Sequence, residues 1–166
     1  MQATRVFIHG LESTSRGTKG AFFKERYPEM ILEDFEGSFA QRMDKLEGLL
    51  ANKTDLILVG SSYGGLMAAV YACLNQERVK KLILLAPALH LEPYTPYRNR
   101  KLHIPVTIVH GLRDDVVPLA EVRAIAERLF TNRTFSAVED DHSLHDTFAA
   151  LPWDALLDLR DLPAPG

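Results

Sequence analysis

The stretch LILVGSSYGG, residues 56–65, decides how this chain of 166 residues folds. Its first four residues, Leu56–Val59, are apolar without alternation, which is typical of a strand covered on both faces of a parallel sheet. From Gly64 to about Leu74, small residues recur at helical spacing and predict a helix that packs tightly on that sheet. A Gly-x-Ser-x-Gly turn between such a strand and such a helix exposes the hydroxyl of its serine. We therefore interpret Ser62 as a candidate nucleophile.

This turn has two other interpretations. Ser61 is one, but it would need a glycine at position 59, which is Val59, so the motif selects Ser62. A turn that serves structure alone is the other, because glycine and serine are frequent in many loops. The strand before it and the helix after it favour the nucleophile.

Strand and helix patterns alternate along the rest of the chain. This alternation predicts one α/β domain, residues 1–166, with a mainly parallel sheet of about six strands flanked by helices. Ligands of such sheets bind beyond the carboxyl ends of the strands. The other expected strands are 5–8, 30–32, 79–85, 106–109 and 134–138, and the expected helices are 20–27, 38–50, 119–130, 144–151 and 153–159.

Composition excludes several functional classes. Charged residues make up 25% of the chain and the net charge is −3, so we expect neither nucleic acid nor a membrane as partner. No apolar run reaches the roughly 18 residues of a spanning helix, and the N-terminus has no signal-peptide pattern. Cys73 is the single cysteine, which fits a cytoplasmic location, and we expect an inert, buried thiol there.

Residues that complement a serine nucleophile follow two later strands. A serine hydroxyl needs a base to take its proton, usually a histidine oriented by a carboxylate. Asp114 follows the predicted strand 106–109, and His142 follows the predicted strand 134–138. The order serine, acid, histidine is that of a triad on an α/β sheet.

At this point the sequence resembles the α/β-hydrolase superfamily. Three motifs carry the resemblance: Gly60–Gly64 at the turn, His110–Pro118 around the acid, and Asp141–Ser143 around the histidine. The opening His9–Ser13, followed by Lys19, is similar to the oxyanion loop of small bacterial esterases of the YqiA type. The resemblance implies a shortened α/β-hydrolase fold with strand order 4-3-5-6-7-8 in superfamily labels and a minimal cap.

The resemblance also implies roles for individual residues. The acid of the family follows its glycine by three residues, which selects Asp114 over Asp115. An acidic-then-histidine loop after the last strand favours His142 over His145. The backbone N–H groups of Leu11 and Tyr63 are the implied oxyanion donors. Leu11 serves equally well as apolar lining of a pocket.

These residues predict a serine hydrolase, a carboxylesterase that acts on small-molecule esters with short acyl groups. No HExxH, paired CxxC or calcium-loop pattern occurs, so we expect no metal and no cofactor. A thioesterase or amidase with the same triad is one alternative, and a non-catalytic binding protein is another. Residues 93–100 are interpreted equally well as a substrate gate or as an ordinary surface loop. The sequence does not predict an oligomeric state.

Overall fold

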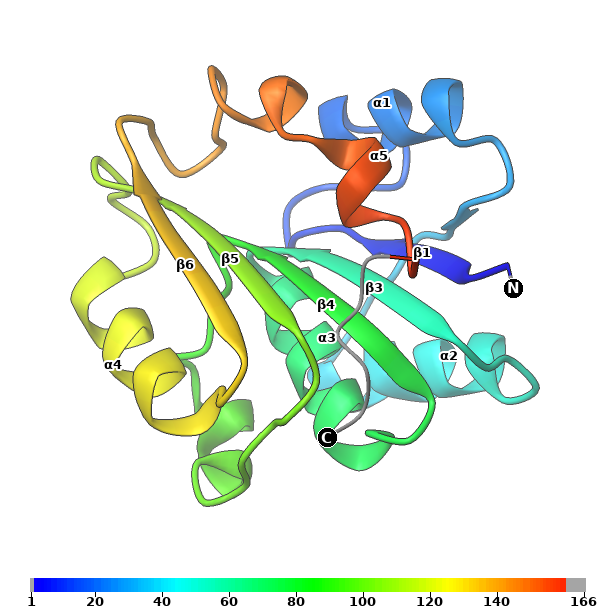
Figure 1. Ribbon diagram of the computed structural model, residues 1–166, viewed down its shortest axis with the longest axis horizontal. Coiled ribbons are helices and arrows are strands. Elements are labelled where there is room, and N and C mark those ends of the chain that lie inside the picture. The colour runs from blue at the N-terminus through cyan, green and yellow to red at the C-terminus, as the bar shows by residue number, and fades with distance from the viewer. Residues whose placement is uncertain (1, 161–166) are drawn as a thin grey trace.

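Six parallel strands form one sheet in the computed structural model, which describes residues 2–160 (Figure 1). The strand order is β2-β1-β3-β4-β5-β6, and each neighbouring pair is parallel. This order confirms the shortened sheet expected from the sequence. The strands are β1 (Thr4–Ile8), β2 (Ile31–Leu32), β3 (Leu56–Ser61), β4 (Val79–Leu85), β5 (Val106–Gly111) and β6 (Arg133–Val138).

Helices cover both faces of the sheet (Figure 1). One face carries α2 (Phe39–Leu50), α3 (Tyr63–Leu74) and α4 (Leu119–Leu129), and the other carries α1 (Thr18–Arg26) and α5 (Trp153–Leu156). Ser38 caps the start of α2, because its side chain accepts a hydrogen bond from the backbone of Gln41. Within residues 2–160, no helix is long and apolar enough to cross a membrane.

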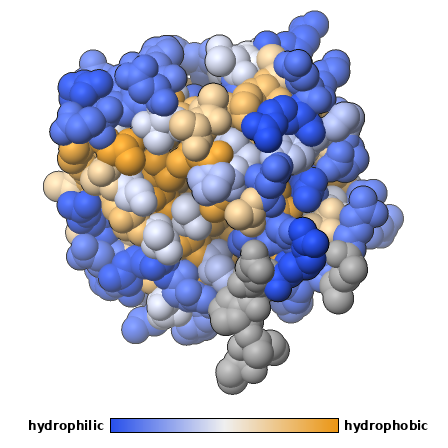
Figure 2. Space-filling view, turned by 45° about the horizontal axis from the view of Figure 1, so that its top comes forward, coloured by the Kyte–Doolittle hydropathy of each residue, from blue (hydrophilic) through white to orange (hydrophobic). Residues whose placement is uncertain are grey.

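The strand β3 lies in the centre of the core, as its apolar run predicts. Leu56 and Leu58 face the cluster under α2, α3 and α4, whereas Ile57 and Val59 face the cluster under α1 and α5. All four side chains are completely buried. Figure 2 shows the outer surface, where hydrophilic side chains surround an apolar area on the face turned toward the viewer.

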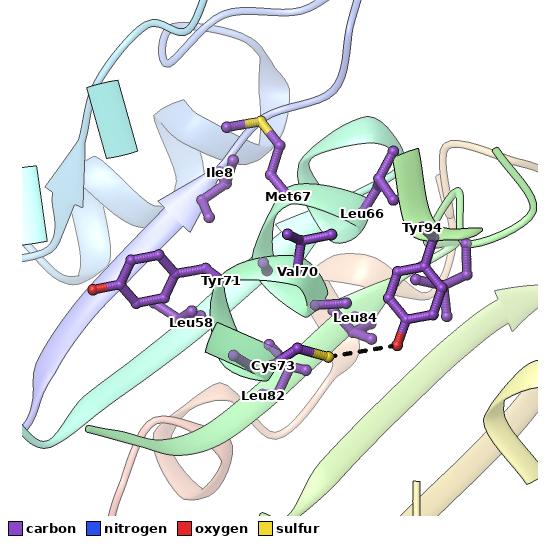
Figure 3. Packing of buried hydrophobic residues seen from close by; sticks show 14 of the residues in the cluster. Ile8, Leu58, Leu66, Met67, Val70, Tyr71, Cys73, Leu82, Leu84 and Tyr94 are labelled. Atoms are coloured by element: carbon purple, nitrogen blue, oxygen red, sulfur yellow. Dashed lines mark hydrogen bonds between the residues drawn. The ribbon is translucent and has the colours of Figure 1, made fainter. Parts of the chain in front are cut away.

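Close packing under α3 holds this central helix against the sheet (Figure 3). Met67 and Val70 of α3 are buried with Leu84 of β4 in the same cluster. The Sγ atom of Cys73 lies 3.9 Å from the hydroxyl oxygen of Tyr94 (Figure 3). Cys73 is therefore the buried thiol that the sequence predicts, and burial raises its pKa.

One expected helix is wrong, and one segment expected as a gate or surface loop contains a short helical turn. The helix predicted over 144–151 is wrong, because only Phe148–Ala150 forms a 3-10 turn. The side chain of Asp140 accepts hydrogen bonds from the backbone of Asp146 and Thr147, so these amides close a loop instead of a helix. Residues 92–97 form a second 3-10 turn, in which Tyr94 is completely buried.

Candidate active site

Ser62 occupies a sharp turn between β3 and α3. Its φ of 55° and ψ of −114° are unusual for a residue with a side chain, and such strain is common at functional sites. The N–H of Ser62 donates to the carbonyl of Leu85 at 2.9 Å, and its own carbonyl accepts from Ala88 at 3.0 Å. A Cβ on Gly64 would lie 2.0 Å from the carbonyl oxygen of Ile8, so only glycine allows this close approach. The turn is therefore held rigidly against two neighbouring strands.

Asp114 follows β5 and is buried beside the loop that carries His142. The Oδ1 atom of Asp114 accepts the backbone N–H groups of Val116 at 2.9 Å and Val117 at 2.8 Å. Its Oδ2 atom lies 2.8 Å from Nδ1 of His142. The neighbouring Asp115 is exposed to solvent. Of the two carboxylates, the structure brings Asp114 to the histidine.

His142 and Ser62 line the same pocket. The Nδ1–H of His142 donates to a carboxylate, so Nε2 carries the lone pair that a general base needs. Within residues 2–160, no hydrogen bond joins the Ser62 hydroxyl to His142. Such bonds are often long in the absence of substrate and tighten when it binds.

His145, the competing histidine, pairs with a different acid. Its Nδ1 lies 2.5 Å from Oδ2 of Asp141, and both side chains are well exposed. The hydrogen bond that His145 donates to the Asp141 carboxylate raises the pKa of His145. His145 therefore lacks the buried carboxylate that orients His142.

The loop that carries His142 is held by two residues that the sequence analysis did not assign. Asp140 is buried and accepts the backbone N–H groups of Asp141, Asp146 and Thr147. Burial raises the pKa of Asp140, but these hydrogen bonds outweigh burial and lower it to about 2. Lys19 Nζ donates to the carbonyl of Ser143 at 2.8 Å. Lys19 lies 124 residues from Ser143 in the sequence, so no local pattern predicts this contact.

The two expected oxyanion donors also line the pocket. Within residues 2–160, the backbone N–H groups of Leu11 and Tyr63 have no hydrogen-bond acceptor. The loop that carries Leu11 is held by His9, whose Nδ1 donates to Gly10 at 2.7 Å and whose Nε2 accepts the N–H of Phe35 at 2.8 Å. The structure thus leaves two backbone donors available near Ser62.

The pocket encloses about 700 Å³. Ser62 and His142 line it together with Phe22 and Phe148. The rings of these two phenylalanines meet edge to face, with their centroids 5.0 Å apart. Of the segment 89–101, only His90 and Leu91 line the pocket. The proposed gate residues 93–100 do not, since the ring of Tyr94 packs into the core instead.

A sequence model of the alpha/beta hydrolase fold family matches residues 10–97. The match covers just over half of the chain and includes the turn at Ser62. Among curated proteins, no sequence is similar enough to match this chain.

Solved structures share the fold over most of their length. Est1E from Butyrivibrio proteoclasticus is 20% identical, with a TM-score of 0.76 over 94% of this chain and 86% of its own. The alpha/beta hydrolase domain-containing protein 10 from mouse is also 20% identical, with a TM-score of 0.72 over 84% and 82%. A monoacylglycerol lipase from Paleococcus ferrophilus is 15% identical, with a TM-score of 0.65 over 82% and 86%. At these identities the likeness concerns the fold.

Proposed function

This chain belongs to the alpha/beta hydrolase fold family, and on that premise we propose that it is a serine carboxylesterase for small esters with short acyl groups. Family membership and the likeness to an esterase and a lipase support hydrolase activity in general. The proposed triad is Ser62, His142 and Asp114. The proposal includes no cofactor or metal.

In the proposed reaction, Oγ of Ser62 attacks the ester carbonyl carbon while Nε2 of His142 accepts the hydroxyl proton. The N–H groups of Leu11 and Tyr63 stabilise the oxyanion, and loss of one such donor typically raises a barrier by about 3 kcal/mol. His142 then protonates the leaving oxygen, the carbon–oxygen bond to the alcohol breaks, and an acyl-enzyme remains. Water then gives a proton to His142 and attacks the acyl carbon. The bond between that carbon and Oγ of Ser62 breaks, His142 returns the proton to Oγ, and the acid leaves.

The strongest support is the hydrogen bond of 2.8 Å between His142 and the buried Asp114, at a pocket that Ser62 also lines. A buried carboxylate holds the imidazole in one tautomer and stabilises the imidazolium that forms during the reaction. A protein that merely binds a ligand has no need of this arrangement.

Labelling with a fluorophosphonate tests the nucleophile directly. We expect mass spectrometry to find one adduct on Ser62, no adduct in Ser62→Ala, and a retained adduct in Ser61→Ala. Folding of each variant is checked by circular dichroism. A folded wild-type protein that stays unlabelled contradicts the proposal.

A substrate panel separates ester hydrolysis from its alternatives. We expect hydrolysis of p-nitrophenyl acetate and butyrate to exceed that of acyl-CoA thioesters and of anilides. Faster turnover of thioesters or anilides assigns the same triad to a different acyl transfer. Equal rates for wild type and Ser62→Ala favour a non-catalytic binding protein.

A further inference from the structure

A second histidine contacts the carboxylate of the proposed triad. His110 lies in the last part of β5 with a completely buried ring, and its Nε2 lies 3.2 Å from Oδ2 of Asp114. The same oxygen lies 2.8 Å from Nδ1 of His142. Two imidazoles therefore meet one carboxylate oxygen, whereas the two backbone N–H groups described above hold the other.

The surroundings of His110 determine which of its nitrogens carries the proton. Its Nε2 faces two acceptors, Oδ2 of Asp114 at 3.2 Å and the carbonyl oxygen of Val117 at 3.1 Å. Its Nδ1 is buried without a partner among residues 2–160. A proton on Nδ1 would lack an acceptor, and a bare Nε2 would face two acceptors. The arrangement therefore requires a proton on Nε2.

The same surroundings keep His110 neutral. Burial lowers its pKa, although the carbonyl of Val117 and the charge of Asp114 act in the opposite direction. Among residues 2–160, His142 and Arg123 of α4 also act on His110, and both lower its pKa further. A second proton would also create an unpaired N–H on the buried Nδ1.

We propose that His110 is a positioning residue for the triad, an inference that rests on the proposed function. Its Nε2–H, which donates to the carbonyl oxygen of Val117, also lies against Oδ2 of Asp114, so the ring fixes the direction in which that oxygen meets His142. The partial positive charge of that N–H faces Oδ2 of Asp114 and therefore weakens the hold of that oxygen on the His142 N–H.

Replacement of His110 by side chains with and without a donor tests this role. His110→Leu keeps an apolar volume and loses the N–H, whereas His110→Gln places an amide N–H near the position of Nε2. The rate constant kcat/KM for p-nitrophenyl acetate is measured from pH 5 to 9. His103→Leu is the control, because His103 is exposed and hydrogen-bonded to Thr131 outside the pocket.

In His110→Leu we expect the part of the profile where kcat/KM rises with pH to move to higher pH by about one unit. At a given pH on that part of the profile, kcat/KM is then about tenfold lower than in wild type. His110→Gln and His103→Leu are expected to keep the wild-type profile. A His110→Leu profile that matches wild type overturns the proposal. A shift in His110→Gln as large as that in His110→Leu also overturns it, because a packing role does not depend on a donor.

Nitrogen-15 NMR of the histidine rings tests the inference without any turnover. In the wild-type protein we expect His110 to carry its proton on Nε2 and to be neutral at pH 7, because burial lowers its pKa. A proton on Nδ1, or a charged ring at pH 7, overturns the inference even if His110→Leu does not fold. If wild type hydrolyses no ester, the proposed function fails, and the nitrogen-15 shift of His142 Nδ1 decides the inference separately. That shift should change in His110→Leu and stay as in wild type in His110→Gln, and an unchanged shift in His110→Leu overturns the inference.

Discussion

Gly111 lies directly against the peptide of Asp140. A Cβ on Gly111 would lie 2.5 Å from the Asp140 carbonyl oxygen, closer than any side chain tolerates. Beside this contact, the N–H of Leu112 donates to Val138 at 2.8 Å, and the N–H of Arg113 donates to Asp140 at 3.0 Å. These bonds join the loop after β5 to the loop after β6, so they bring the acid and the histidine together.

Gly111→Ala should therefore separate Asp114 from His142. We expect kcat for p-nitrophenyl acetate to fall by about 100-fold, since a shift of about 1 Å in a reacting group can have that effect. Steady-state kinetics measures the loss. Gly48→Ala is the matched control, because a Cβ there meets nothing within 4 Å on an exposed part of α2. It should keep full activity and gain up to about 1 kcal/mol in free energy of unfolding. Equal activity in both variants would contradict the importance of this contact.

Asp114→Asn should reduce kcat by about 10⁴-fold, as an amide that donates toward Nδ1 forces His142 into the wrong tautomer. The side-chain volume hardly changes, so the fold should persist. Asp115→Asn, one residue away and exposed, should retain wild-type kinetics. A similar loss in both variants would assign the effect to the loop and not to the carboxylate.

Asp140 should make stability depend on pH in acid. Its pKa is about 2 in the folded protein and 3.8 in the reference state, so the unfolded chain binds its proton first as pH falls. The stabilisation is complete above about pH 4 and is lost as pH decreases from about 4 toward 2. Urea unfolding of Asp140→Asn should therefore show a larger deficit from wild type at pH 7 than at pH 3. Asp44→Asn, exposed on α2, is the control. An Asp140→Asn deficit that is equal at both pH values would refute this role.

Lys19→Met should loosen the loop around His142. The variant loses the hydrogen bond to the Ser143 carbonyl but keeps an apolar stem beside Phe148, over whose ring the Lys19 Nζ lies at 5.5 Å. We expect kcat for a neutral ester to fall by about tenfold with little change in KM, because the histidine moves while the pocket remains. Lys24→Met, on the exposed side of the same helix, should leave both constants unchanged. A rise in KM with constant kcat would indicate that Lys19 contacts the substrate instead.

Local patterns were sufficient for the architecture. The unbroken apolar run Leu56–Val59 predicts a doubly covered strand, and all four of its side chains are completely buried. Alternation of strands with helices predicts a parallel sheet, whose carboxyl edge gathers residues from distant loops. The region 144–151 was predicted wrongly, because hydrogen bonds to the side chain of Asp140 determine that loop and a helical pattern does not reveal them.

The sequence by itself determined the alternation of strands and helices, the turn at Ser62 and the set of candidate acids and histidines, because these depend on short-range patterns. The family resemblance selected Asp114 over Asp115, and in the tertiary structure Asp114 meets His142. Only the tertiary structure decided that His110 lies against the same carboxylate oxygen. These contacts join loops that are about 30 residues apart in the sequence. Which donor faces which lone pair there depends on the direction of the side chains, and packing of the whole sheet sets that direction.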